Sequence, residues 1–405
     1  MSNVTDYIII GNGVAGNSAA EAIRASDSSG SIKIFTEEKY PFYARVRLPQ
    51  FIADEVPLEK LILKNDKWYK EKNIDLYLNE PVIDANPDEK TITTIIGRTF
   101  SYNKLLLATG SHSFIPQIKG VKAKQVFSLR NLEDAIKIKN QIKGKKNAII
   151  IGGGLLGLET GKALMSHGLE VAVVENSDRL LPRQMDASGA RILRCMMEKM
   201  GYKFYMGLGV KEIVEEGGRL ILIMNDNSTI TGDMILISAG VRPNLLLAER
   251  LGLSTRNGVI VNDYLQTSKQ DIFSAGDIAE HNSKIYGIWP AAKDQGTAAG
   301  KNMAGVTEKY TGTTMSNVLK VAGINLTSIG DIDAENKNRN IINIDDENGI
   351  YKKYVIKDDI LIGCILLGDT KEQKTLERAI SEKKHIDEIQ KELIPALYKE
   401  TPRQS

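Results

Sequence analysis

Residues 7–16 read YIIIGNGVAG, and residues 148–157 read AIIIGGGLLG. In both segments a short apolar run, typical of a buried parallel strand, leads directly into glycines spaced as GxGxxG and then into a helix-forming stretch. In such a turn the first glycine permits the tight bend, the second lets the backbone approach a pyrophosphate, and the third lets helix and strand pack closely. A single copy would fit a simple helix-packing turn equally well. Two copies in matching context predict two dinucleotide sites.

Each copy also ends in the same way, so the chain contains an imperfect internal duplication. Residues 105–110, LLLATG, and residues 235–240, ILISAG, are apolar strands that close on small residues and glycine. Residues 271–277 add a short strand and a Gly-Asp turn, and from about Thr314 short strands are mixed with a charged helical tail over residues 370–400. We predict an α/β fold with two Rossmann-like dinucleotide-binding domains and a small α+β C-terminal domain. The expected bounds are 1–115 with 246–313 for the first domain, 116–245 for the second and 314–405 for the third.

A carboxylate is expected about 20 residues after each glycine turn, at the end of the next strand, where it can bind a ribose. Glu175 ends such a strand in the second unit. In the first unit either Glu37 or Glu38 fits, and the spacing leaves that choice open. The alternative is that these are ordinary solvated carboxylates. A carboxylate at Glu175 would repel a 2′-phosphate, which favours NADH over NADPH, although Arg179 and Arg183 follow closely.

Composition narrows the class of protein. The 405 residues carry 53 basic and 51 acidic side chains, a formal charge of +2, so nucleic acid and anionic membranes are not expected partners. The sequence begins with polar residues and contains no apolar run of the ~20 residues needed to span a bilayer, so we expect a cytoplasmic protein. The two cysteines, Cys195 and Cys364, are too few for a disulfide framework, and no metal site is expected.

With both glycine motifs, residues 108–110 (ATG) and residues 275–277 (AGD) in this order, the chain resembles the pyridine nucleotide-disulfide oxidoreductase superfamily of flavoproteins. Residues 39–48, KYPFYARVRL, and residues 180–186, LLPRQMD, are similar to NADH:rubredoxin oxidoreductases and to the flavoprotein part of NADH-dependent nitrite reductases. The resemblance implies that the first domain binds FAD and the second binds NADH.

The resemblance also implies site residues. Asp277 would meet the ribityl and pyrophosphate portion of FAD, and the helix expected over 293–304, preceded by 289–292, would point its start at the flavin. Glu159 would lie near the nicotinamide; relatives pair it with a lysine that this chain lacks, and we expect Arg45 to substitute. The implied FAD contacts are Gly11, Asn12, Gly13, Val14, Ala15, Gly16, Glu37 or Glu38, Lys39, Arg45, Val82, Ala108, Thr109, Gly110, Asp277, Pro290 and Ala291. The implied NADH contacts are Gly152, Gly154, Leu155, Leu156, Gly157, Glu159, Glu175 and Gly240.

The absence of cysteines from the FAD domain indicates the type of reaction. Disulfide-reducing relatives need a cysteine pair in the FAD domain, and peroxide- or oxygen-reducing relatives need a single cysteine there, but residues 43–52 contain none. Cys195 and Cys364 lie in apolar contexts, so we expect both to be buried structural residues. Hydride transfer from nicotinamide to flavin would then be followed by single-electron steps to an acceptor near the flavin edge. His112, His167, His281 and His385 show no metal-ligand spacing, and we expect surface or structural roles.

Three functions fit these features. The first is a reductase of a small rubredoxin-like iron-sulfur protein, which the lack of additional iron-sulfur or sirohaem cysteine motifs favours. The second is the NADH-oxidising component of a nitrite reductase or other redox assembly, and the third is a flavin-binding regulatory protein without turnover. We expect a monomer or homodimer, with strands at 319–324 and 354–356 beside the flavin domain. The lysines at 352–353 and 383–384 could steer an acidic partner or simply be solvated.

Overall fold

The computed structural model describes residues 4–393, which divide into two compact units. Unit 1 contains residues 4–114, 130–132 and 241–313. Unit 2 contains residues 115–129, 133–240 and 314–393. Across this described range no helix is long and apolar enough to cross a membrane.

Unit 1 is built on a sheet whose central strand, β1 (Thr5–Ile10), leads into the first glycine turn. Its strands run in the order β3-β2-β1-β6-β18 and are all parallel, with Ile9 paired to Ile34 on one side and to Leu106 on the other. The middle of this sheet is apolar and buried, as shown by residues 8–10, Ile34, Phe35 and residues 105–107. The remaining bounds are β2 (Ile32–Phe35), β3 (Ile74–Tyr77), β6 (Thr99–Leu107) and β18 (Ile272–Ser274).

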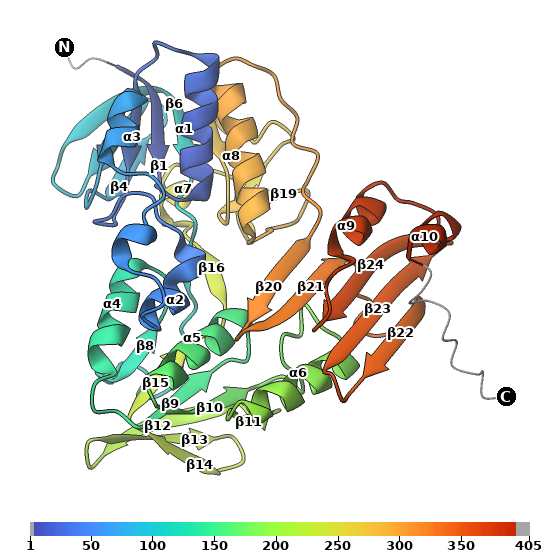
Figure 1. Cartoon of the computed structure of the whole chain (residues 1–405). Coiled ribbons are helices and arrows are strands. Elements are labelled where there is room, and N and C mark those ends of the chain that lie inside the picture. Colours follow the sequence, from blue (N-terminus) through green and yellow to red (C-terminus); the bar gives the residue numbers. More distant parts are fainter. Residues whose placement is uncertain (1–3, 394–405) are drawn as a thin grey trace. The chain divides into compact units, whose positions relative to one another are not determined.

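Two helices of unit 1, α1 (Val14–Ser26) and α8 (Trp289–Met303), lie side by side (Figure 1). Glycines make this close packing possible. A Cβ at Gly296 would lie 2.2 Å from the Ala15 carbonyl oxygen, and a Cβ at Gly300 would lie 2.4 Å from that of Ala19. The contact therefore holds the middle of α8 against the start of α1, next to the first glycine turn.

Shorter elements complete unit 1. The strands β4 and β5 extend the sheet from β6 as antiparallel partners, β7 pairs with β16, and β17 pairs with β19. Their bounds are β4 (Val82–Asn86), β5 (Thr91–Thr94), β7 (Ser111–Ser113), β16 (Val241–Pro243), β17 (Val259–Val261) and β19 (Ala279–His281). The short helices are η1 (Arg45–Arg47), α2 (Leu48–Ile52), η2 (Leu58–Lys60), α3 (Asp66–Glu71) and α7 (Leu246–Arg250).

Unit 2 repeats the plan with a parallel sheet in the order β11-β10-β9-β15-β8. The central strand β9 (Asn147–Ile151) leads into the second glycine turn and α5 (Leu155–Ser166). An antiparallel sheet, β12-β13-β14, packs its apolar face against the same core. The other bounds are β8 (Val126–Ser128), α4 (Leu132–Gln141), β10 (Glu170–Glu175), α6 (Ala187–Lys199), β11 (Lys203–Met206), β12 (Val210–Glu216), β13 (Arg219–Met224), β14 (Thr229–Gly232) and β15 (Met234–Ile237).

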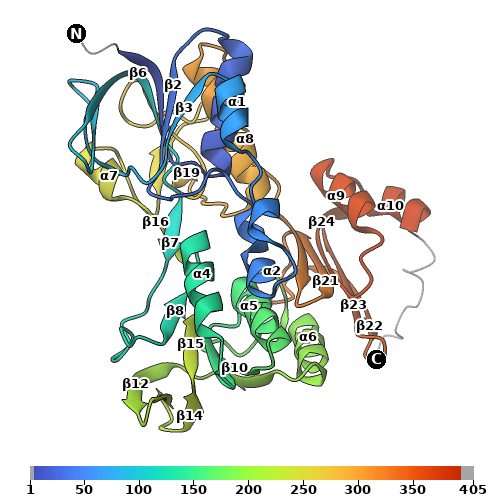
Figure 2. The same ribbon diagram turned by 60° about the vertical axis from the view of Figure 1, so that its left-hand side comes forward.

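The C-terminal part of unit 2 is an antiparallel sheet in the order β20-β21-β24-β23-β22. Two helices, α9 and α10, cover one face (Figure 2), where Tyr354, Cys364 and Leu366 pack against Leu376 and Ile389. The strands are β20 (Ser316–Val321), β21 (Ile324–Gly330), β22 (Arg339–Asp345), β23 (Ile350–Lys357) and β24 (Ile360–Leu367), and the helices are α9 (Gln373–Ser381) and α10 (Ile386–Leu393). The α/β prediction with two Rossmann-like sheets and an α+β C-terminal part is confirmed.

Several local expectations were wrong. The helix expected from residue 293 already begins at Trp289, because Pro290 suits the first helical turn. The strand expected over 319–324 is a hairpin, which reverses at Ala322 and Gly323 with positive φ angles of 49° and 97°. The charged tail is helical as predicted over its described part, in two helices separated by residues 382–385, and its residues 394–400 lie outside the described range.

The expectations for Cys195 and for the lysines at 352–353 were also wrong. Cys364 is buried, but Cys195 is exposed, because it lies on the solvent side of the amphipathic helix α6. Lys352 and Lys353 are neither solvated nor available to a partner. Lys352 pairs with Asp369 and Glu372, at 3.2 and 2.9 Å. The fully buried Lys353 pairs with Asp186 at 3.1 Å and donates to the Asp333 carbonyl at 2.7 Å.

Candidate dinucleotide-binding sites

The three glycines of the first turn differ in their surroundings: two pack closely against the backbone and one faces open space. Gly11 has a φ of +116°, and a Cβ there would lie 2.1 Å from the Ala108 carbonyl oxygen. A Cβ at Gly16 would lie 2.0 Å from the Gly11 carbonyl oxygen. A Cβ at Gly13, in contrast, would meet nothing in the described chain within 4 Å. The outer glycines are therefore required by the fold, whereas Gly13 leaves open space at the start of α1.

The second turn has the same geometry. Gly152 has a φ of +111° and approaches the Ser238 carbonyl oxygen, which would lie 2.3 Å from an added Cβ. Gly157 packs on Gly152 in the same way, at 2.6 Å, and Gly154 faces open space within the part of the chain described. Gly13 and Gly154 are the N-caps of α1 and α5, and neither helix start receives a side-chain cap from residues 4–393. The free N–H groups and the open space fit a phosphate at each turn.

An orphaned donor at the first turn provides a further test of fit. The Nδ2 atom of Asn12 is buried, yet it has no hydrogen-bond partner within residues 4–393. Buried polar groups in proteins nearly always have a partner. A ligand oxygen at Gly13 would supply one, so the residues present fit a dinucleotide phosphate at this turn.

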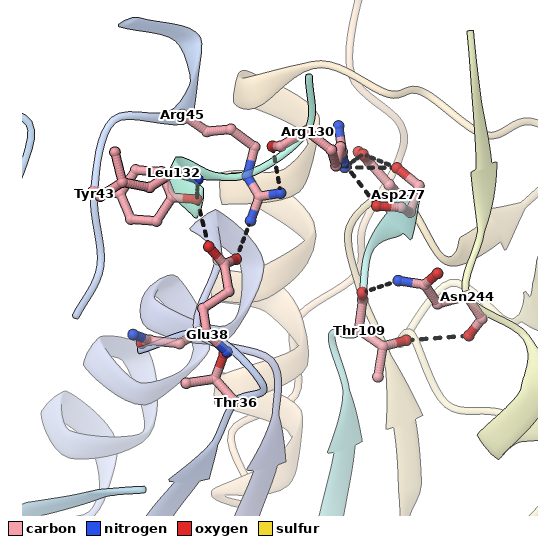
Figure 3. A network of polar contacts seen from close by, with 12 residues as sticks. Thr36, Glu38, Tyr43, Arg45, Thr109, Arg130, Leu132, Asn244 and Asp277 are labelled. Atoms are coloured by element: carbon pink, nitrogen blue, oxygen red, sulfur yellow. Dashed lines mark hydrogen bonds and ion pairs between the residues drawn. The ribbon is translucent and has the colours of Figure 1, made fainter. Parts of the chain in front are cut away.

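Glu38 lies at the centre of a polar cluster beyond the end of β2 (Figure 3). The Tyr43 hydroxyl and the Arg45 guanidinium each donate to its carboxylate at 2.5 Å. Arg45 also donates to the Arg130 carbonyl at 2.9 Å, and the Leu132 N–H donates to the Tyr43 hydroxyl at 3.0 Å. Burial and the negative charge of Glu38 raise the pKa of Tyr43, so its hydroxyl keeps its proton. Glu37, the other candidate, is exposed.

Asp277 belongs to a second cluster in unit 1 (Figure 3). Its Oδ2 accepts from the Ser111 hydroxyl at 2.8 Å and from Arg130 at 2.9 Å. Burial, together with repulsion from Arg45, lowers the pKa of Arg130. Beside this cluster the Asn244 side chain donates to the Thr109 carbonyl at 2.7 Å. The geometry thus fixes the position of a carboxylate at the expected Gly-Asp turn.

The other residues predicted for the first site take varied positions in unit 1. The Phe42 ring lies 5.8 Å from the Trp289 ring, so residues 39–48 rest against the start of α8, where Pro290 and Ala291 form the first turn. Val82 begins β4 and packs at the edge of the core. Val14 and Ala15 open α1, Ala108 and Gly110 follow β6, and Lys39 is exposed.

Glu175 ends β10 in unit 2, where the sequence placed it, and its carboxylate reaches the second glycine turn. It accepts from the Gly153 N–H at 2.5 Å and from the Ser177 N–H at 2.7 Å. Of the two nearby arginines, Arg179 pairs with the exposed Asp178 at 3.3 Å and Arg183 is exposed. The carboxylate is therefore held at the turn by backbone N–H groups.

The remaining residues predicted for the second site also lie at this end of unit 2. Leu155 and Leu156 open α5, Gly240 follows β15 with a φ of +97°, and Glu159 is half-buried on α5. Burial and the charge of Glu159 raise the pKa of Tyr202, whose hydroxyl donates to the Leu158 carbonyl at 2.7 Å.

Sequence reasoning missed four polar residues of unit 1: Tyr43, Ser111, Arg130 and Asn244. Tyr43 could have been found, since it lies inside the segment 39–48. Arg130 gave no such signal, because it belongs to a three-residue return of the chain into unit 1. The pairing of Arg45 with Glu159 stays a prediction; the contacts of Arg45 described above are with Glu38 and Arg130.

Comparisons with known proteins show which family the chain belongs to. The model of the pyridine nucleotide-disulphide oxidoreductase family matches residues 5–296, and that of the rubredoxin NAD+ reductase C-terminal domain matches residues 316–384. The chain is 32% identical to the NADH-rubredoxin oxidoreductase of Clostridium acetobutylicum, over 95% of this chain and 97% of the relative. A solved structure of NADH:rubredoxin oxidoreductase from the same organism is 31% identical, has a TM-score of 0.80 and covers 95% of this chain and 97% of its own.

Longer relatives match as well. A nitrite reductase [NAD(P)H] of Bacillus subtilis is 35% identical over 95% of this chain but only 48% of the relative. The chain thus spans about half the length of this curated relative, and the same holds for the assimilatory nitrate reductase electron transfer subunit of that organism, at 50%. The resemblance inferred from the sequence motifs is confirmed. The chain belongs to the pyridine nucleotide-disulphide oxidoreductase family, and this membership assigns FAD and NAD(H) to it as cofactors.

Proposed function

We propose that this protein is an FAD-dependent NADH oxidoreductase that delivers electrons one at a time to a small acceptor protein of the rubredoxin type. The observation that carries the proposal is the combination of two open glycine turns with a flavin-side segment, residues 43–52, that contains no cysteine. Similarity to a NADH-rubredoxin oxidoreductase over nearly its full length supports the choice of acceptor. The match to a rubredoxin NAD+ reductase C-terminal domain supports it further.

FAD would be held by unit 1. The open space at Gly13 would take the pyrophosphate, Glu38 the adenosine ribose, and Asp277 with Arg130 the opposite end of the cofactor. We choose Glu38 over Glu37 because Glu38 is fixed by two hydrogen bonds whereas Glu37 is exposed. The other FAD contacts implied by the family resemblance are proposed on the same basis.

NADH would be held by unit 2. Gly154 would face its pyrophosphate, and the Glu175 carboxylate would accept a ribose hydroxyl and repel a 2′-phosphate. We therefore propose NADH rather than NADPH as the donor. Glu159 and Arg45 are our candidates for the charged residues closest to hydride transfer.

When bound, the flavin ring can take up a hydride and release its electrons singly. The residues of this chain bind and orient the two cofactors, and they offer no thiol relay. Burial raises the pKa of Cys364 to about 12, so this residue remains an unreactive thiol at neutral pH. Cys195 lies in α6 of unit 2 and outside the flavin-side segment. Electrons must therefore leave the flavin directly.

Anaerobic titration of the FAD-loaded protein with NADH tests the enzyme assignment. One equivalent of NADH should bleach the visible flavin absorbance rapidly; no bleaching would mean a flavin-binding protein without turnover. Steady-state NADH oxidation with rubredoxin, ferredoxin, dioxygen and nitrite then tests the acceptor. Rubredoxin should give the highest kcat/KM, and an equal rate with dioxygen would reject the rubredoxin assignment.

A second candidate is the NADH-oxidising part of a nitrite-reducing assembly. The observation in its favour is the alignment of this chain with about half of the Bacillus subtilis nitrite reductase. This candidate predicts that the protein reduces one-electron dyes but neither rubredoxin nor, by itself, nitrite. Nitrite reduction would then appear only after addition of a partner that carries the nitrite-reducing centre.

A further inference from the structure

Three polar side chains form a hydrogen-bonded network at the first glycine turn. Tyr69 on α3 and Asn17 on α1 are almost fully buried, at 2% and 1% exposure, and their side chains meet Asn12 inside the turn. The Tyr69 hydroxyl lies 2.9 Å from the amide oxygens of both asparagines. The Asn17 Nδ2 donates to the Asn12 Oδ1 at 2.8 Å and to the Gly13 carbonyl at 3.0 Å. The turn is thus tied through Asn12 to Tyr69 on α3, 57 residues further along the chain.

The hydrogen-bond donors of this network determine the orientation of the Asn12 side-chain amide. Burial raises the pKa of Tyr69 to about 12, so its hydroxyl carries one proton, which is shared between the Asn12 and Asn17 oxygens, each at 2.9 Å. Asn17 is then oriented to donate through Nδ2 to the Asn12 oxygen. The oxygen of Asn12 is held toward Asn17 and Tyr69, and its buried Nδ2 is the one side-chain group of the network that lacks a partner in the described chain. A buried donor in that state is unfavourable until an acceptor arrives.

The second turn shows that this network is not a requirement of the fold. Gly153 and Leu158 stand in the positions of Asn12 and Asn17, so no side-chain amide is present there. A buried tyrosine is present, but the Tyr202 hydroxyl donates to a backbone carbonyl, that of Leu158. The two turns nevertheless have the same backbone. The amide network is therefore not needed to form the bend.

We propose that Tyr69 and Asn17 are positioning residues, which hold Asn12 so that its Nδ2 donates to the FAD pyrophosphate lying at Gly13. This inference rests on the proposed function, in that it takes the first turn as the FAD site. An amide donor to a charged phosphate oxygen is among the stronger hydrogen bonds. Tyr69 touches neither reacting atom; it acts through the orientation of Asn12.

A double-mutant cycle on the full-length apoprotein tests the inference by FAD titration. Asn12→Ala should raise the Kd for FAD about tenfold to a hundredfold, the range of a hydrogen bond to a charged group. Tyr69→Phe should raise it about threefold to tenfold, because Asn12 loses its fixed orientation. In the Asn12→Ala background Tyr69→Phe should add no further loss. Tyr202→Phe is the matched control and should leave the Kd for FAD unchanged.

Two spectroscopic readouts separate positioning from a merely structural role. The ³¹P resonances of bound FAD should shift in Asn12→Ala and Tyr69→Phe but not in Tyr202→Phe. In wild-type protein labelled with ¹⁵N-asparagine, the side-chain amide resonance that Asn12→Ala removes should move when FAD binds. This second measurement needs no change at Tyr69 and holds even if Tyr69→Phe fails to fold.

Additive losses in the double variant, a wild-type Kd in Tyr69→Phe, or an Asn12 amide resonance indifferent to FAD would each overturn the inference. Failure of the proposed function looks different. In that case the wild-type protein itself would not bind FAD, or its bound flavin would not be bleached by NADH.

Discussion

The two glycine turns share a backbone but differ in what surrounds them. In both, the outer glycines touch carbonyl oxygens and the middle glycine is open. Around the first turn, Asn12, Asn17 and Tyr69 form a side-chain network with one donor left over. At the second turn, Gly153 has no side chain, and its N–H is already taken by the Glu175 carboxylate.

This difference in surroundings means that the two turns should bind their proposed nucleotides with different strengths. The first turn presents an unmatched donor, so binding of a phosphate repairs a deficit in the protein. The second turn has the free N–H groups of a helix start but no unpaired side-chain donor, and it adds a carboxylate acceptor, so binding there depends more on the ribose. We expect FAD to stay bound to unit 1 and NADH to bind and leave unit 2.

The largest expected effect comes from substitutions that disrupt the packing of the turns themselves. Gly16→Ala should lower the free energy of unfolding by at least about 2 kcal/mol, because its methyl group would overlap the Gly11 carbonyl oxygen at 2.0 Å. The corresponding change in unit 2, Gly157→Ala, should lower it by less, since the contact there is 2.6 Å. Urea unfolding of the apoproteins measures both. Equal losses would show that the two turns are packed equally tightly.

The next largest effect concerns access of the nucleotide to the turn rather than packing of the turn itself. Gly13→Ala should weaken FAD binding at least about tenfold while changing apoprotein stability by less than about 0.5 kcal/mol, because its Cβ enters open space. Gly154→Ala should do the same to NADH binding and leave FAD content intact. Titration of both variants with both nucleotides checks the assignment. Loss of FAD binding in Gly154→Ala but not in Gly13→Ala would reverse the roles of the units.

The carboxylate at the second turn should control the choice of nicotinamide nucleotide. Glu175→Gln should reduce the preference for NADH over NADPH by about tenfold, because repulsion of a 2′-phosphate is removed. The ratio of kcat/KM for the two donors is the measurement. Glu38→Gln is the matched control in unit 1; it should weaken FAD binding and leave that ratio unchanged. A ratio unaffected by Glu175→Gln would place the discrimination elsewhere.

The smallest expected effect concerns the connection between the first helix of each unit and the strand that follows it. In unit 1, Asp27 accepts from the Ser29 and Gly30 N–H groups, and these bonds lower its pKa to about 2. A depressed pKa means that the bonds stabilise the fold above about pH 4 and that this contribution is lost as the pH falls toward 2. The corresponding connection in unit 2, residues 167–169, contains no carboxylate.

Asp27→Asn should therefore lower the melting temperature by about 2–4 °C at pH 7, and the difference from wild type should shrink as the pH approaches 2. Melting curves at pH 7, 4 and 2.5 measure it. Asp178→Asn, in unit 2, is the control, since Asp178 is exposed and paired only with its neighbour Arg179 among the contacts described. A difference that is constant with pH would contradict the role of Asp27.

Residues close together in the sequence could be predicted well. The strands before each glycine turn, the turns and the strand-end position of Glu175 follow from spacing over a few residues. The absence of cysteine from residues 43–52 is likewise a fact of the sequence. Family motifs then identified the nucleotide expected at each turn.

Residues whose role depends on distant partners could not be predicted. The choice between Glu37 and Glu38 needed Tyr43 and Arg45 beside the latter, and Arg130 reaches Asp277 across 147 residues of chain. Lys353 looks like a surface lysine in sequence but is buried against Asp186, 167 residues away.

The sequence by itself thus determined that two glycine turns exist and where their strands lie, because backbone bends depend on neighbouring residues. Only the tertiary structure decided which side chains complete each turn. Burial and hydrogen bonding depend on which elements meet in space, and the meeting of Tyr69 with Asn17 is not encoded in any local spacing.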